Sequence, residues 1–133
     1  MRTHIGHYEI VSELGRGGMG VVYKGYEPAL TRYVAIKELS PALAHDQTLV
    51  ERFLREARSM ASLNDPHIIQ IFLIGQENNQ PFFVMEFVRG VPITDYCDTE
   101  SLGPRERLEL LVPVCRAIQH AHQKGIIHRD IKP

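Results

Sequence analysis

The fold is decided by the stretch of residues 14–37, which reads LGRGGMGVVYKGYEPALTRYVAIK. Within it, Gly15, Gly17 and Gly20 form the pattern G-x-G-x-x-G. Glycines at this spacing let backbone N–H groups approach phosphate oxygens without obstruction by a β-carbon. Taken alone the pattern is weak, because a glycine-rich hairpin without any ligand has the same composition. The residues on either side of the glycines therefore decide what the pattern means.

The flanking residues have the pattern of β-strands. Residues 21–26 are poor helix formers and good strand formers, so the glycines join two antiparallel strands. A dinucleotide-binding oxidoreductase needs such glycines between a strand and a helix, and this context is missing. The lysine and hydroxyl residue of a Walker A loop are absent as well. We predict strands over residues 8–14, 21–26 and 33–38, with a turn at Pro28 between the last two.

A helix and two further strands are expected next. Thr48 and Glu51 have the spacing of a capping box, which predicts a helix over residues 48–63. Apolar runs at residues 68–74 and 82–88 predict two more strands joined by a polar turn. Five strands and one helix predict a small α+β lobe with an antiparallel sheet.

One acidic residue interrupts the apolar face of the predicted helix. Glu56 falls on the apolar side, between Phe53 and Met60 at helical spacing. A buried carboxylate without a partner is costly, so Glu56 should have a cationic partner inside the lobe. Lys37 is the nearest candidate, because it lies on the strand against which this helix must pack. We therefore predict an ion pair between Lys37 and Glu56 that aims the ammonium at phosphates.

The character of the sequence changes after residue 89. Strand periodicity ends there, and Gly90 is the predicted linker between a first domain of residues 1–89 and a second segment of residues 90–133. Apolar residues at helical spacing then predict a long helix over about residues 104–124. Pro113 lies inside this pattern and should kink the helix or remove a backbone hydrogen bond.

Composition and charge restrict the class of protein. Fifteen basic against sixteen acidic residues give a formal net charge of -1, which argues against a nucleic-acid partner. No apolar run is long enough to span a bilayer, and residues 1–8 lack the apolar core of a secretory signal. A cytoplasmic location is therefore expected. Cys97 and Cys115 lack disulfide-scaffold or zinc spacing, and no metal site is predicted in this chain.

Several motifs together resemble the protein kinase superfamily, from about Tyr8 to the end of the chain. Residues 14–22 match the glycine-rich loop, and residues 34–37 match the strand motif V-A-I-K. Glu56 occupies the place of the helix glutamate that pairs with that lysine, and residues 128–130 match the catalytic-loop motif H-R-D. The strings GRGGMGVVY and HRDIKP resemble bacterial, eukaryotic-like serine/threonine kinases. The resemblance implies a kinase N-lobe followed by the first helices of a mainly helical C-lobe.

The resemblance also implies an activity, which is transfer of a phosphoryl group from ATP to Ser or Thr hydroxyls of a protein substrate. Asp130 would accept or orient the hydroxyl proton, and Lys132 would stabilise the transferring group. Met85 would be the gatekeeper, and backbone groups of Glu86 and Val88 would hydrogen-bond the adenine. The residues implied for ATP binding are Leu14, Gly15, Arg16, Gly17, Gly18, Met19, Gly20, Val22, Ala35, Lys37, Glu56, Met85, Glu86 and Val88.

The sequence departs from the family pattern at Pro133, where it ends. In the family, the magnesium ligands are an asparagine and the D-F-G aspartate that follow this point. Use of Mg²⁺ is therefore implied, but with ligands outside this chain, and we expect a truncated fragment with little or no turnover. The alternative is a non-catalytic module that binds a nucleotide or a partner. A kinase–kinase dimer is left open by the resemblance.

Overall fold

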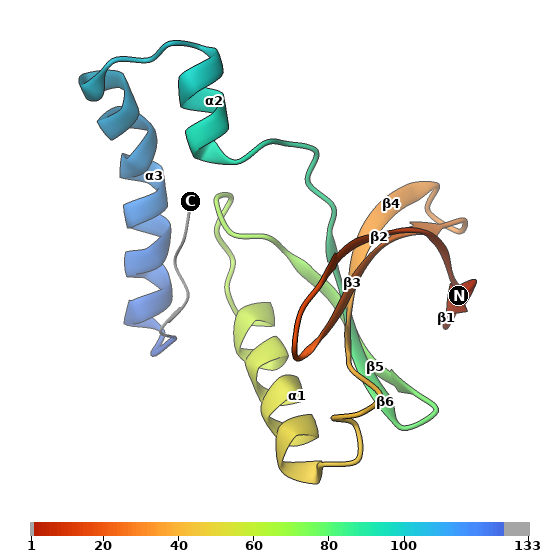
Figure 1. The fold of residues 1–133 in the computed structure, drawn as a ribbon. Helices are drawn as coiled ribbons and strands as arrows, with labels where there is room; N and C mark the ends of the chain where they lie inside the picture. Colours follow the sequence, from red (N-terminus) through yellow and green to blue (C-terminus); the bar gives the residue numbers. More distant parts are fainter. Residues whose placement is uncertain (1, 127–133) are drawn as a thin grey trace. The chain divides into compact units, whose positions relative to one another are not determined.

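The computed structural model describes residues 2–126, which form parts of two compact units (Figure 1). The first unit comprises Met1–Ser62 and Ile69–Phe87, and the second comprises Leu63–Ile68 and Val88–Pro133. All strands and the helix α1 belong to the first unit, whereas the helices α2 and α3 belong to the second.

The first unit is built on one antiparallel sheet of six strands in the order β1-β2-β3-β4-β6-β5. The three strands predicted around the glycines are present and slightly longer than expected. The prediction of five strands missed β1, because two residues are too few to show alternation. The strands are β1 His4–Ile5, β2 Tyr8–Arg16, β3 Gly20–Glu27, β4 Arg32–Leu39, β5 Ile71–Glu77 and β6 Gln80–Glu86.

The hairpin between β5 and β6 differs from the prediction. The sequence suggested a polar turn at 75–81, whereas the turn consists of Asn78 and Asn79 alone, with Glu77 paired to Gln80. Both asparagines have positive φ, at 54° and 63°. Two-residue hairpins favour such dihedrals, and asparagine tolerates them. Gly75 and Pro81, which suggested strand ends, therefore lie within the strands.

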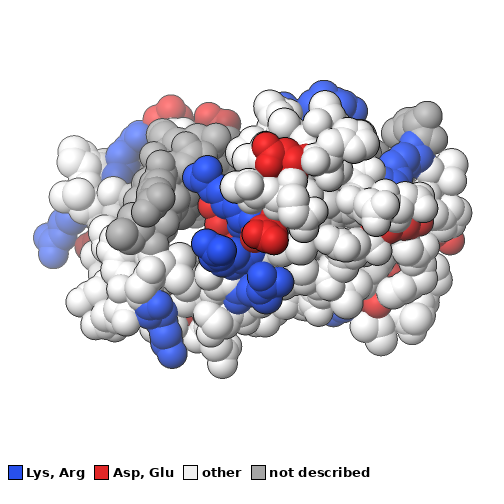
Figure 2. All heavy atoms as spheres, turned by 90° about the horizontal axis from the view of Figure 1, so that it is seen from below, with Lys and Arg blue, Asp and Glu red and all other residues white. Residues whose placement is uncertain are grey.

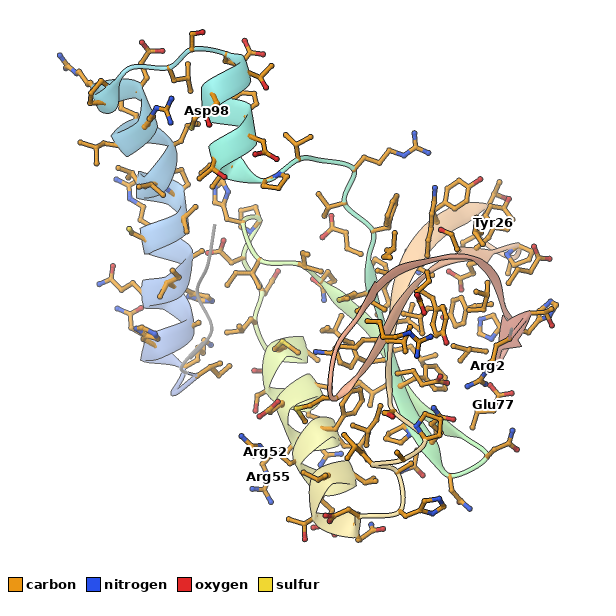
Figure 3. The ribbon with its side chains drawn as sticks, in the orientation of Figure 1. Arg2, Tyr26, Arg52, Arg55, Glu77 and Asp98 are labelled. Atoms are coloured by element: carbon orange, nitrogen blue, oxygen red, sulfur yellow. The ribbon has the colours of Figure 1, made fainter. Side chains whose placement is uncertain are left out.

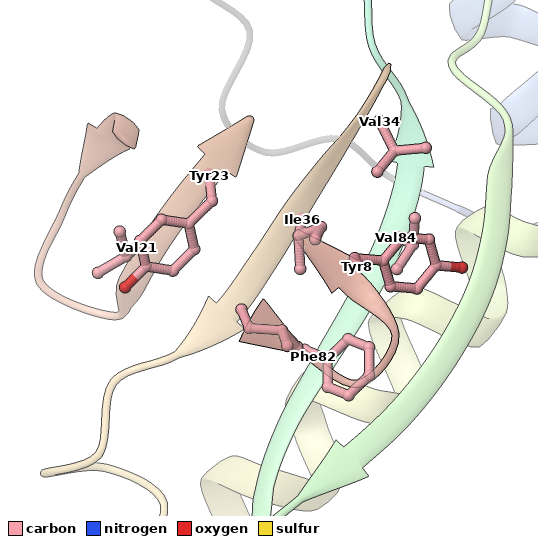
Figure 4. Packing of buried hydrophobic residues seen from close by; sticks show 8 residues of the cluster. Tyr8, Val21, Tyr23, Val34, Ile36, Phe82 and Val84 are labelled. Carbon is pink, nitrogen blue, oxygen red and sulfur yellow. The ribbon is translucent and has the colours of Figure 1, made fainter. Parts of the chain in front are cut away.

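Alternation along the strands creates two apolar faces. On one face, side chains from four strands and β1 pack into a buried cluster (Figure 4). Its members are Ile5, Tyr8, Val21, Tyr23, Val34, Ile36, Phe82 and Val84. On the other face, α1 packs over part of the sheet through Val50, Phe53 and Ala57, which contact Leu39, Ile71 and Phe83. α1 therefore covers the part of this second face that β5, β6 and the end of β4 form.

The helix α1 spans Gln47–Ala61 and begins one residue before the prediction. Its N-cap is Asp46, whose carboxylate accepts hydrogen bonds from the N–H groups of Thr48 at 3.0 Å and Leu49 at 3.3 Å. The predicted capping box at Thr48 was therefore wrong. Aspartate is as good an N-cap as serine or threonine, and here it stands nearer to the start of the helix.

The second unit contains the predicted long helix and one that was missed. The helix α3 spans Pro104–Gln123 and continues through Pro113. The helix α2, Ile93–Thr99, was not predicted, because its β-branched and aspartate residues are weak helix formers. Arg107 on α3 donates to Asp98 on α2 at 3.0 Å, which connects the two helices, and to the Leu102 carbonyl in the loop between them at 2.8 Å. Figure 3 labels Asp98 on α2. Among the described residues, neither helix is both long and apolar enough to cross a membrane.

Candidate functional site

The glycine-rich segment forms a tight turn between β2 and β3. β2 ends at Arg16 and β3 begins at Gly20, so only residues 17–19 lie between the two strands. The Gly17 N–H donates to the Gly20 carbonyl at 2.9 Å. The Ser40 N–H donates to the Met19 carbonyl at 2.9 Å and ties the tip to the end of β4. The glycines therefore join two antiparallel strands, as predicted.

The glycines of this turn serve two different purposes. A β-carbon on Gly20 would lie 2.1 Å from the Glu38 carbonyl oxygen, so the packing of β3 on β4 requires glycine there. A β-carbon on Gly15, Gly17 or Gly18 would meet no atom within 4 Å. The space around these three positions is open, and a bulky anion can reach the backbone.

The tip of the turn also presents hydrogen-bond donors. Within residues 2–126, the N–H groups of Gly18 and Met19 have no intramolecular acceptor. Adjacent backbone N–H groups that point out of a turn are a common form of anion site. Open space and available donors therefore occur at the same place, which is what binding of a phosphate group needs.

Four of the predicted ATP-binding side chains lie on one face of the sheet. Val22 on β3 pairs with Lys37 on β4, and Ala35 on β4 pairs with Met85 on β6. Side chains of directly paired residues point to the same face, as do residues two apart along a strand. Ala35 is 6% exposed, and the other three are partly buried. The sheet thus places an apolar surface beside the ammonium group of Lys37, on the face opposite to the cluster in Figure 4.

The residue after Lys37 is a buried acid. Glu38 is 3% exposed and points to the opposite face of the sheet. Burial raises the pKa of the Glu38 carboxyl, and the guanidinium of Arg2 partly opposes this shift. Arg2 forms an ion pair with Glu38, and its other nitrogen lies 3.4 Å from Glu77 (Figure 3). Glu38 is therefore paired on its own face, and within the described residues Lys37 has no ion-pair partner.

The predicted ion pair between Lys37 and Glu56 is not present among the described residues. Glu56 is exposed and pairs with Arg52 of its own helix at 3.4 Å. Figure 3 shows Arg52 on the side of α1 away from the sheet. At 100° per residue, Glu56 lies about 120° from Val50, at the edge of the buried arc, so solvent can reach it. The prediction that Glu56 lies on the buried side of the helix is therefore wrong.

The remaining predicted residues are placed as follows. Leu14 and Met19 are each 48% exposed, and Arg16 pairs with Glu13 on the same strand. Glu86 is the last residue of β6 and is exposed. Val88 is 56% exposed and belongs to the second unit. The predicted catalytic residues Asp130 and Lys132 lie outside the described residues.

Charge is mixed on the face shown in Figure 2. Basic side chains gather near its middle with acidic groups beside them, and most of this face is uncharged. Within residues 2–126, no group of three or more His, Cys, Asp or Glu side chains could hold a metal ion. The open glycine turn, the Lys37 ammonium and the apolar side chains on the same face of the sheet suit a ligand that has an apolar ring and anionic groups.

Comparison with known proteins identifies the family. A family model for the protein kinase domain matches residues 8–133. The chain is 42% identical over 129 residues to serine/threonine-protein kinase PrkC of Bacillus subtilis (strain 168), covering 96% of this chain and 20% of the relative. It is 40% identical over 131 residues to serine/threonine-protein kinase PknB of Mycobacterium tuberculosis (strain ATCC 25177 / H37Ra), and the match covers 95% of this chain and 21% of that relative. The chain thus spans about a fifth of the length of these relatives.

Solved structures agree with this result. The crystal structure of the PknI kinase domain of M. tuberculosis aligns with a TM-score of 0.77 and 33% identity, covering 100% of this chain and 55% of that one. A structure described as the apo form of PpkA-294 aligns with a TM-score of 0.81 and 27% identity, and the match covers 97% of this chain and 53% of that one. The fold is that of a kinase N-lobe followed by part of a C-lobe. This chain therefore belongs to the protein kinase domain family, and its relatives are bacterial serine/threonine-protein kinases.

Proposed function

We propose that this chain binds ATP as part of a kinase that phosphorylates Ser or Thr residues of proteins. The observation that carries the proposal is the shared face of Val22, Ala35, Lys37 and Met85 beside an open glycine turn. An adenine ring needs an apolar surface, and a triphosphate needs donors and a cation. Both are present in the first unit: the N–H groups lie at the tip of the turn, and Lys37 on β4 pairs with Val22, close to the start of β3.

Each group has a defined part in binding. Val22 and Ala35, together with Leu14, cover the adenine ring, and Met85 limits the depth of the pocket as the gatekeeper. The N–H groups at the tip of the turn donate to phosphate oxygens. Lys37 interacts with the phosphates as a point charge.

The chemical step uses residues outside the described part of the chain. The Ser or Thr hydroxyl oxygen bonds to the γ-phosphorus, the bond from that phosphorus to the β–γ bridging oxygen breaks, and ADP leaves. Asp130 takes the hydroxyl proton, and Lys132 interacts with the charge of the transferring group. Bound Mg²⁺ supplies charge neutralisation in such reactions. The roles proposed for Asp130 and Lys132 rest on the H-R-D-I-K-P string and on the similarity to serine/threonine kinases.

Nucleotide binding is tested on the chain itself. We expect ATP to bind and to raise the melting temperature, and Lys37→Met to weaken binding about ten-fold or more, because a charge-assisted contact to phosphate is lost. Lys124→Met is the matched control, because Lys124 is exposed at the end of α3. If the chain binds no ATP, or if both variants bind equally well, the proposed site is wrong.

Catalysis is tested by assaying the protein for phosphoryl transfer, which also separates a kinase from a non-catalytic nucleotide-binding module. We expect radiolabel from γ-labelled ATP on Ser or Thr residues in the presence of Mg²⁺. The Asp130→Asn variant should bind ATP normally and transfer no label. ATP binding without transfer by the wild-type protein would support the non-catalytic module instead.

A further inference from the structure

Lys24 lies beside the proposed adenine surface but outside the motifs that identify the family. It pairs with Ala35 on β4, and Ala35 pairs in turn with Met85 on β6. These three residues form one row across three strands, so their side chains point to the same face. Along β3, Lys24 follows Val22 in the direction away from the glycine turn. Its ammonium therefore belongs to the adenine end of the site, away from the groups proposed to bind the phosphates.

Aromatic rings surround this ammonium. The Lys24 Nζ lies 4.4 Å from the centroid of the Tyr33 ring and 5.0 Å from the centroid of the Phe87 ring. Both distances fall within the range of about 6 Å over which an aromatic ring attracts a cation. The ring of Tyr26, labelled in Figure 3, extends the group, with its centroid 5.2 Å from that of Tyr33. In the described part of the chain, Lys24 makes no ion pair, so the rings are its charge partners.

Phe87 directly follows the residue whose backbone is proposed to bind adenine. β6 ends at Glu86. The Glu86 N–H donates to the Gln70 carbonyl at 2.9 Å, and the Gln70 N–H donates to the Glu86 carboxylate at 3.3 Å. Because the Glu86 N–H is already used, a hydrogen bond from the Glu86 backbone to a ligand must come from the carbonyl oxygen. The orientation of that carbonyl depends on the position of Phe87, which shares the peptide group.

We propose that Lys24 is a positioning residue for adenine recognition. Its ammonium holds the Phe87 ring against Tyr33 and thereby fixes the Glu86 carbonyl in the orientation that accepts a hydrogen bond from the base. A group that is fixed before binding does not lose freedom on binding, so the ligand binds more tightly. The inference rests on the proposed function, because the carbonyl matters only if adenine binds there.

The test compares two ligands on the full chain. Dissociation constants of ATP and of inorganic tripolyphosphate are measured by isothermal titration calorimetry for the wild type, K24M and K24R. Methionine keeps the apolar stem and removes the charge, whereas arginine keeps a cation over the rings. We expect K24M to bind ATP about two- to five-fold more weakly, as the loss of one partly exposed cation–π contact implies. Tripolyphosphate binding should be unchanged, and K24R should bind ATP like the wild type.

Controls separate positioning from a general structural effect. Lys124→Met removes an exposed charge elsewhere and should leave both constants unchanged. Equal losses for both ligands, or a K24R variant as weak as K24M, would overturn the proposal. If K24M does not fold, Phe87→Leu removes the other partner and should give the same selective loss for ATP. A wild-type chain that binds neither ligand contradicts the proposed function, whereas ATP binding that K24M retains in full contradicts only the role of Lys24.

Discussion

At the scale of single residues, the glycine turn shows that one motif can combine packing with ligand binding. Gly20 is required by the backbone of Glu38, whereas the space at Gly17 and Gly18 is open. The sequence pattern does not distinguish these glycines. The difference matters for mutation, because of Gly17, Gly18 and Gly20 only Gly20 should affect the stability of the ligand-free protein when it is replaced.

Gly20→Ala should destabilise the first unit by about 1–3 kcal/mol, the usual range for overpacking a well-packed site. The reason is that the new β-carbon would meet the Glu38 carbonyl oxygen at 2.1 Å, and backbone in a paired strand cannot easily move. Urea unfolding measures the change. Gly17→Ala is the control and should be near neutral, because its β-carbon enters open space. Equal stabilities for the two variants would contradict the assignment.

Arg2→Met should destabilise the protein in a pH-dependent manner. Burial raises the pKa of Glu38, and loss of Arg2 raises it further. A group whose folded pKa is raised stabilises the folded state in acid, and this contribution is lost as the pH rises through the folded pKa. The destabilisation should therefore be about 1–3 kcal/mol near neutral pH. It should become smaller as the pH falls below about 4, where the Glu38 carboxyl becomes protonated in both the folded and the unfolded protein.

Thermal and urea unfolding across this pH range check the prediction for Arg2. The matched background is Glu38→Gln, which has no charge to titrate. In that background, Arg2→Met should have an effect that does not depend on pH. A destabilisation that is as large in acid as at neutral pH would show that the ion pair with Glu38 is not its cause.

At the scale of elements, α1 depends on a cap that lies just before it. Asp46→Ala should cost about 0.5–2 kcal/mol, because the N–H groups of Thr48 and Leu49 lose their acceptor. Thr48→Ala should cost much less, because no side-chain capping bond from Thr48 is present among the described residues. Urea unfolding of the two variants measures both changes in the free energy of unfolding. A larger loss for Thr48→Ala than for Asp46→Ala would favour the capping box expected from the sequence over the Asp46 cap.

At the scale of the whole molecule, the two units differ in how much apolar surface they bury. The buried clusters of the sheet and α1 belong to the first unit. In the described part of the second unit, the buried hydrophobic residues are Leu63, Cys97 and Ala117. α3 exposes Leu108 at 65% and Val112 at 45%. The second unit should therefore be the less stable one.

Native-state hydrogen exchange followed by mass spectrometry tests this difference in stability. Amide protons of β3, β4 and β6 should exchange more slowly than those of α2 and α3, because opening the helices exposes less apolar surface. Addition of ATP should slow exchange at the glycine turn, where the N–H groups are proposed to bind phosphates. Equal protection of both units would mean that they unfold as a single cooperative structure.

Local pattern was sufficient for most elements of the first unit. Residues 21–26 and 33–38, predicted as strands, lie within β3 and β4, because their alternation and β-branched content are local properties. The predicted ends of β5 and β6 are wrong. Glycine and proline commonly mark strand ends, but here the pairing of the two strands includes both Gly75 and Pro81. The proposed catalytic and nucleotide-binding roles could be assigned only from motifs, since side-chain partners are not local.

Local features along the chain are enough to show that strands flank the glycines and that the chain resembles protein kinases, because alternation and motif spacing can be read without any long-range contact. Three contacts became visible only in the folded chain: Glu56 pairs with Arg52, Gly20 packs against the Glu38 backbone, and Lys24 lies over the Phe87 ring. Each of these depends on strand register or on the rotation of a helix against the sheet. Both are set by the packing of residues that lie far apart in the sequence, so no local pattern can specify them.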